Sequence, residues 1–167
     1  MTIKFYTGIE HIQNTKKPIQ KSWELSFHHL GLNPSLLKLI EIISDHENLF
    51  INRNPYHNQY HLAEVIWASA YLAKEETWND YFFDSMVVLL IAANFHDAEH
   101  PGYGSKVPFE IEEKSVEFFK NWWENNSLFV ENIISINPLH AEQIICELIL
   151  FTDFFQGQDQ VRNDYLN

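Results

Sequence analysis

The chain has 167 residues, of which 46% are hydrophobic and 15% aromatic, and its formal net charge is −12. This length favours one domain with a sizeable core, and the apolar content excludes a disordered chain. The acidic balance argues against binding a nucleic-acid polymer through a basic surface. The single cysteine, Cys146, excludes an intrachain disulfide, and no apolar run reaches the length of a membrane span. We therefore expect a soluble cytoplasmic protein with no membrane contact.

The hydrophobic periodicity predicts an all-α fold. In chain order, helices are expected over residues 18–30, 34–46, 57–75, 81–97, 108–126 and 138–155. Gly31 should stop the first helix, and the Asn33-Pro34 and Asn137-Pro138 pairs should begin the second and the last. Residues 48–56 and 101–105 are predicted loops, and residues 127–136 are compatible with a short helix. No repeat or linker divides the sequence, so we expect one domain covering residues 1–167.

Two histidine pairs stand out in this pattern. His57 and His61 are four residues apart at the start of one predicted helix. His96 and His100 are also four residues apart, at the end of another, and Asp97 stands next to His96. Residues four apart in a helix project from the same face. An apolar run leads into the His96-Asp97 pair, and a buried carboxylate is costly unless a cation neutralises it. Imidazole and carboxylate together suit divalent zinc, iron or manganese, so the pattern favours a metal site.

The segments around these pairs carry a family resemblance. Residues 56–65 read Tyr-His-Asn-Gln-Tyr-His-Leu-Ala-Glu-Val, and residues 96–102 read His-Asp-Ala-Glu-His-Pro-Gly. They resemble the HD-domain metal-dependent phosphohydrolase superfamily, and its cyclic-nucleotide phosphodiesterase branch in particular. Further segments follow one another in an order similar to that of small predicted bacterial HD phosphohydrolases. The segments are Trp23-Glu24-Leu25, Phe95-His96-Asp97, residues 111–116 and Phe151-Thr152-Asp153. The resemblance spans about residues 22 to 155 and implies a single compact multi-helix HD-domain bundle.

The resemblance also implies roles for residues. His61, His96 and Asp97 match metal ligands for one or two divalent ions, zinc, iron, manganese or magnesium. His57 matches the histidine that protonates the departing alcohol oxygen. His100 and Glu112 match residues that hold metal-bound waters, and Thr152-Asp153 matches a segment beside the pocket. The implied activity is a phosphodiesterase or phosphomonoesterase reaction on a nucleotide or related small phosphate ester, through a metal-bound hydroxide.

Two departures from the family pattern leave an alternative open. The family's fourth ligand is an aspartate in an Asp-x-Asp-Leu or Ala-Asp-Leu segment, and none occurs up to Asn167. We therefore expect this chain to lack the C-terminal helices of the domain, or a partner chain to supply the ligand. Phe118 stands where the phosphodiesterases have a glutamate. The alternative is a catalytically inactive HD domain that serves as a metal- or ligand-binding regulatory module.

Other residues are interpreted as structural. His28 and His29 are expected to cap a helix or to face solvent, and Asn58 to form hydrogen bonds at a helix start. The pairs Phe118-Phe119, Trp122-Trp123 and Phe154-Phe155 are expected in the core. A di-iron oxygenase would need more carboxylate and histidine ligands than the sequence offers. A purely structural bundle would leave the two histidine pairs to coincidence.

Overall fold

The computed structural model describes residues 4–32, 37–44, 56–73, 82–101, 107 and 109–152. Within these ranges the chain forms seven helices and no strand, which confirms the predicted all-α fold. The helices are α1 (Phe5–Gln13), α2 (Pro18–Leu30), α3 (Leu37–Ser44), α4 (Gln59–Ala73), α5 (Phe82–Phe95), α6 (Glu110–Glu131) and α7 (Pro138–Leu150). None of these helices has the combination of length and apolar character that crossing a membrane requires.

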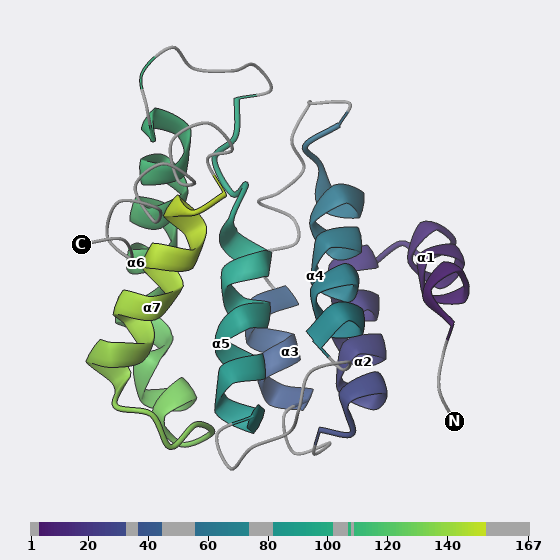
Figure 1. The fold of residues 1–167 in the computed structure, drawn as a ribbon, viewed down its shortest axis with the longest axis horizontal. Coiled ribbons are helices and arrows are strands. Elements are labelled where there is room, and N and C mark those ends of the chain that lie inside the picture. Colours follow the sequence, from purple (N-terminus) through teal and green to yellow (C-terminus); the bar gives the residue numbers. More distant parts are fainter. Residues whose placement is uncertain are drawn as a thin grey trace, which may run out of the picture.

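Helix α5 lies at the centre of the bundle (Figure 1). It packs against α4 on one side and against α6 and α7 on the other, while α2 contacts α4, α3 and α1. The sequence of α5 is apolar on all sides, which is typical of a helix surrounded by others. Helices α4 and α5 run in opposite directions (Figure 1), so the start of α4 and the end of α5 meet at the same end of the bundle.

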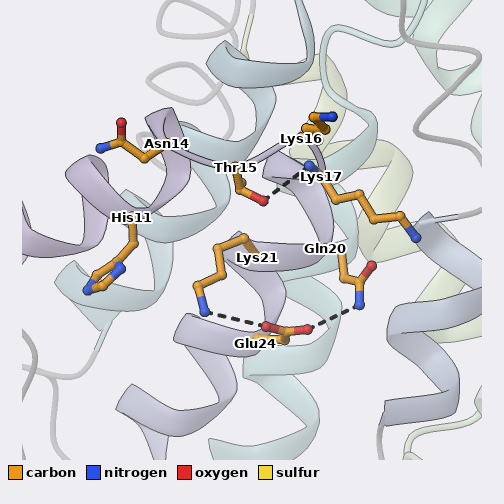
Figure 2. Close-up of a pocket in the computed structure, with 8 residues that line it drawn as sticks. All are labelled: His11, Asn14, Thr15, Lys16, Lys17, Gln20, Lys21 and Glu24. Atoms are coloured by element: carbon orange, nitrogen blue, oxygen red, sulfur yellow. Dashed lines mark hydrogen bonds and ion pairs between the residues drawn. The ribbon is translucent and has the colours of Figure 1, made fainter.

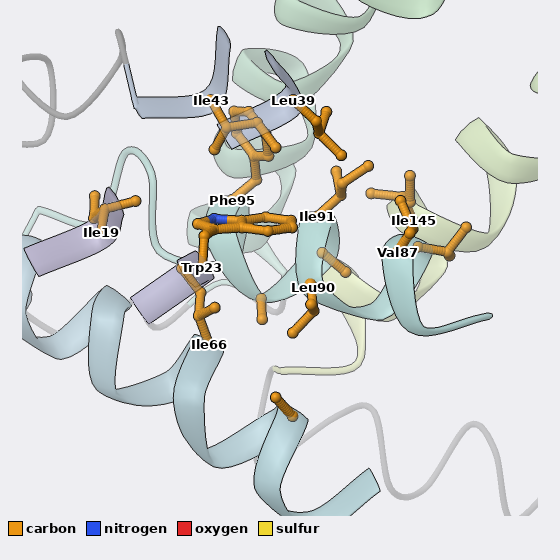
Figure 3. Packing of buried hydrophobic residues seen from close by; sticks show 14 of the residues in the cluster. Ile19, Trp23, Leu39, Ile43, Ile66, Val87, Leu90, Ile91, Phe95 and Ile145 are labelled. Carbon is orange, nitrogen blue, oxygen red and sulfur yellow. The ribbon is translucent and has the colours of Figure 1, made fainter. Parts of the chain in front are cut away.

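The hydrophobic core is continuous through the bundle. Figure 3 shows the Trp23 indole of α2 among side chains of α4 and α5, including Ile66, Leu90 and Phe95. The predicted placement of aromatic pairs in the core is confirmed for Phe119, Trp122 and Trp123, which are buried, and Phe118 is partly buried against the same cluster. Phe154-Phe155 lies outside the described residues.

Several helix boundaries agree with the sequence signals. Helix α2 has the predicted bounds, and Gly31 follows it with φ of 70°, a left-handed conformation that glycine adopts without strain. Pro138 begins α7, and the Asn137 side chain accepts hydrogen bonds from the backbone N–H groups of Leu139 and His140. The predicted loops at 48–56 and 101–105, and the predicted start of the second helix, fall mostly outside the described residues.

Several predicted boundaries were wrong. Helix α5 ends at Phe95, so His96 and Asp97 follow it. Helix α4 begins at Gln59, so His57 precedes it. Helix α6 runs on to Glu131, because the side chains of Asn125 and Asn126 donate to carbonyls one turn back instead of stopping the helix. Helix α7 ends at Leu150 and is followed by a turn.

The predicted exposure of His29 was also wrong. His28 is exposed, but His29 is buried, with its ring stacked on Tyr71 and edge-on to Trp67, both from α4. The α2 sequence alone does not reveal that α4 covers this position. The aromatic contacts explain how an imidazole is accommodated inside the bundle.

Helix α1 was not predicted, and Gly8 at its centre explains its close approach to α4. The Gly8 Cα faces the buried Trp67 indole, whose Nε1–H donates to the Phe5 carbonyl at 3.0 Å. A Cβ at position 8 would clash with the indole atoms Cε2 and Nε1. Only glycine therefore permits this contact without a shift of α1 or of Trp67.

Substitution Gly8→Ala should lower the free energy of unfolding by about 1–3 kcal/mol, because overpacking costs more than the gain in helix propensity. Urea denaturation followed by circular dichroism measures the change. Thr7→Ala, one residue earlier and exposed, is the matched control and should stay within about 0.5 kcal/mol of the parent. Equal stability of Gly8→Ala and Thr7→Ala would contradict the close α1–α4 packing.

Candidate metal centre

The candidate centre lies where the start of α4 meets the end of α5. Asn58 begins α4: its side-chain oxygen accepts from the N–H groups of Tyr60 at 2.9 Å and His61 at 3.3 Å, as predicted for a residue at a helix start. His57 therefore stands just before the helix and His61 in its first turn. On the other side, His96 and Asp97 form the turn that directly follows α5.

Three imidazoles converge on one carboxylate oxygen. Asp97 Oδ2 lies 2.9 Å from His57 Nδ1, 3.1 Å from His61 Nε2 and 3.1 Å from His96 Nε2. Histidines from both pairs, which are about forty positions apart in the sequence, thus lie next to the same carboxylate oxygen. The ring of His100, the fourth histidine of the two pairs, lies parallel to the His57 ring, with centroids 3.5 Å apart.

Electrostatics hold Asp97 in its ionised form. Burial alone would raise the pKa of the Asp97 carboxyl, but hydrogen bonds from His61, His96 and His57 and the charge of His96 outweigh it. The resulting pKa lies far below the usual value for aspartate. Asp97 is therefore a carboxylate at any pH at which the protein works, and it offers a full negative charge to a cation.

The pKa values of His96, which is buried, and His100, which is partly buried, shift in opposite directions. Burial lowers the pKa of His96, but the Asp97 hydrogen bond, the Asp97 charge and the bond to the Ala93 carbonyl together raise it above the ordinary value. Burial lowers the pKa of His100; the attraction of Asp97 opposes this effect, and the neighbouring histidines reinforce it. His100 is therefore neutral near pH 7.

The donor set fits a divalent cation. His96 Nδ1 lies 2.9 Å from the Ala93 carbonyl oxygen, which can only accept, so Nδ1 carries a proton whether or not the ring is charged. His96 Nε2 is then the nitrogen that faces Asp97, and a histidine anchored through its other nitrogen is the usual arrangement for a metal ligand. Among the described residues, ligand atoms of His57, His61 and Asp97 also lie within 4.8 Å of one another, a spacing that one ion can span.

The structure thus brings together His57, His61, His96, Asp97 and His100, all singled out by the sequence. Glu112 lies in the first turn of α6 and is partly buried. The Thr152 hydroxyl donates to the Ile149 carbonyl at the end of α7, and Asp153 lies outside the described residues.

Sequence reasoning missed Tyr56, which is largely exposed and lies against the rings of His57 and His61. Its position next to His57 was the available signal.

A surface pocket of about 470 Å³ lies apart from this centre, at the turn between α1 and α2 (Figure 2). It is lined by His11, Asn14, Thr15, Lys16, Lys17, Gln20, Lys21 and Glu24. Within it Lys21 and Gln20 both contact the Glu24 carboxylate, at 3.6 Å and 3.1 Å (Figure 2). None of the histidines of the candidate centre lines it, so the pocket belongs to a different surface.

Comparison with known proteins points to one family. The model of the 3′5′-cyclic nucleotide phosphodiesterase family matches residues 56–121, a segment that includes every candidate histidine and Glu112. The cGMP-specific 3′,5′-cyclic phosphodiesterase delta of Plasmodium falciparum (isolate 3D7) is 32% identical over 120 residues, which cover 56% of this chain and 15% of that protein.

Two mammalian proteins match a shorter stretch. The high affinity cAMP-specific and IBMX-insensitive 3′,5′-cyclic phosphodiesterase 8A of Homo sapiens is 48% identical over 50 residues, covering 29% of this chain and 6% of that protein. The Mus musculus protein of the same name is 40% identical over 57 residues, covering 34% and 7%. This chain therefore matches only a small part of each relative's length, and no solved structure gives a significant match. Residues 56–121 carry the signature of the cyclic nucleotide phosphodiesterases, which confirms the resemblance of this chain to the HD-domain metal-dependent phosphohydrolases.

Proposed function

We propose that this chain carries the metal centre of a phosphodiesterase that cleaves a nucleotide phosphate ester, with His61, His96 and Asp97 as ligands of a divalent cation. The observation that carries the proposal is the convergence of three imidazoles on Asp97 Oδ2, within 3.1 Å. One carboxylate and several imidazoles suit zinc, iron or manganese, and magnesium remains a further choice. When bound, such an ion would neutralise charge on the phosphoryl group and would lower the pKa of a coordinated water toward neutrality.

His57 is proposed as the proton donor to the leaving alcohol oxygen. Its Nδ1 is held by Asp97 at 2.9 Å, which orients the ring and leaves Nε2 to carry the transferred proton. The His100 ring lies parallel to the His57 ring, with centroids 3.5 Å apart, and this stacking further restricts the orientation of His57. His100 and Glu112 are proposed to hold water beside the cation.

The test is hydrolysis by the purified chain. Metal-stripped protein should cleave bis-p-nitrophenyl phosphate, cAMP or cGMP only after Mn²⁺, Zn²⁺ or Mg²⁺ is added, and EDTA should abolish the reaction. His96→Ala should be inactive, while His140→Ala, an exposed histidine on α7, should match the parent. A His96→Ala protein as active as the parent would rule out the assignment.

A second candidate is a metal- or ligand-binding module without catalysis. Phe118, which stands where the phosphodiesterases have a glutamate, packs its ring 6.1 Å from that of Phe95 and is partly buried. An apolar side chain there contributes to the core instead of the centre's chemistry. Stoichiometric metal binding without hydrolysis of any of the three substrates would favour this candidate.

His57 lies as close to Asp97 as the proposed ligands do, so its role requires a separate prediction. His57→Ala should keep the metal and lose about 10²–10⁴-fold in kcat, the usual contribution of general acid catalysis. Metal content by atomic emission and turnover on the same sample measure both effects. If His57→Ala instead loses the metal, His57 is a ligand and the proton donor lies elsewhere.

A further inference from the structure

Helix α2 makes a buried hydrogen bond to α4, which carries His61, and another to α5, which directly precedes His96 and Asp97. The Ser22 hydroxyl donates to the Ala63 carbonyl of α4 at 2.6 Å. The neighbouring residue, Trp23, donates from Nε1 to the Asn94 side-chain oxygen of α5 at 3.2 Å. All of these residues are fully buried, and Figure 3 shows the Trp23 indole reaching in among the side chains of α4 and α5.

Both bonds end close to the proposed metal ligands. Ala63 lies two residues after His61, and Asn94 lies two residues before His96. A helical carbonyl has a second lone pair, so Ala63 accepts the Ser22 hydroxyl without losing its place in the helix. The Asn94 amide nitrogen has no hydrogen-bond partner among the described residues, so the Trp23 bond alone fixes the orientation of that side chain.

We propose that Ser22 and Trp23 are positioning residues for the metal centre: together they set the placement of His61 relative to His96 and Asp97. This inference rests on the proposed function, because it takes these residues as ligands. Ligands from two helices must be held to within about 0.5 Å of the productive geometry. Two buried hydrogen bonds from adjacent residues of a third helix add directional contacts to the apolar packing of α4 and α5 and so specify one arrangement of the two helices.

The test compares two variants that remove one bond each with two matched controls. Ser22→Ala removes the bond to α4, and Ser26→Ala, one turn later on α2, removes a buried hydroxyl that has no partner among the described residues. Trp23→Phe removes the bond to α5, and Trp67→Phe removes a similar indole bond that joins α4 to Phe5 of α1, away from the centre. Ser22→Thr restores a hydroxyl at the first position.

The readouts are Co²⁺ affinity by competition with a chelator, the visible spectrum of the Co²⁺ protein, and the melting temperature of the metal-free protein. Ser22→Ala and Trp23→Phe should each raise the Kd for Co²⁺ by about tenfold or more and alter the ligand-field bands, as loss of supporting hydrogen bonds does at metal sites. Ser26→Ala and Trp67→Phe should leave both unchanged even where the melting temperature falls. Ser22→Thr should recover the parental Kd.

Unchanged Co²⁺ affinity and spectra in Ser22→Ala and Trp23→Phe would overturn the inference and leave these residues as core packing. A parent chain that binds no Co²⁺ would overturn this inference together with the metal centre. A parent chain that binds Co²⁺ in a Ser22- and Trp23-dependent manner but hydrolyses no diester would support the inference and overturn the proposed hydrolase.

Discussion

Replacing Asp97 with asparagine is expected to abolish metal binding and diester hydrolysis together. Asp97 Oδ2 is the shared neighbour of His57, His61 and His96, and its low pKa makes it the fixed negative charge of the centre. Asparagine keeps the size of the side chain but removes that charge. A bound metal ion stabilises the charge of the transition state by several kcal/mol. Loss of the metal should therefore lower kcat/KM by about 10³-fold or more. Metal analysis and initial rates on one preparation measure both effects.

Asp84→Asn is the matched control for this substitution. Asp84 is buried in the first turn of α5, the helix that directly precedes His96 and Asp97, and it accepts a hydrogen bond from the Ser135 N–H at 3.0 Å. Asparagine retains an oxygen acceptor there, so metal content and activity should stay at the parental level. A metal content in Asp97→Asn equal to that in Asp84→Asn would show that the centre does not depend on the Asp97 charge.

The residues of the centre could be predicted because histidines recur at short spacing beside apolar helices, although His57 precedes α4 and His96 follows α5. His57 and His61, and His96 and His100, each lie four apart, and the apolar run before His96 marks a buried helix end. Local sequence could not show that all three imidazoles meet at one oxygen of Asp97. That convergence depends on α4 and α5 lying antiparallel, a property of the packing between helices.

The errors in the predicted fold likewise come from contacts between helices that are far apart in the sequence. Helix α1 carries an apolar stripe at Phe5, Ile9 and Ile12, a spacing that could have revealed it, but Gly8 in its centre lowers the helical signal. Gly8 is explained only by the Trp67 indole against it, which belongs to another helix. The two bonds that join α2 to α4 and α5 likewise connect residues 41 and 71 positions apart, beyond the reach of any local pattern.

Substitution Phe95→Ala is expected to cause a large loss of stability, about 3–5 kcal/mol in the free energy of unfolding. Phe95 is the last residue of α5, is fully buried and directly precedes His96. Its ring meets Phe119 edge-on at 5.4 Å and lies 5.1 Å from the Trp122 ring, both on α6. Alanine would leave a cavity between α5 and α6 that rigid aromatic neighbours cannot fill.

Urea denaturation of the metal-free protein measures this loss of stability, and two further variants serve as comparisons. Phe95→Leu retains much of the volume and should lose less than half as much as Phe95→Ala, because hydrophobic replacements closer in size are tolerated better. Phe151→Ala, at a half-exposed phenylalanine that follows α7, should lose well under 1 kcal/mol. If Phe95→Ala lost no more than Phe151→Ala, the aromatic contact with α6 could not be what anchors the end of α5. The position of His96 and Asp97 would then depend on the contacts of α5 with the other helices, α4 and α7 among them.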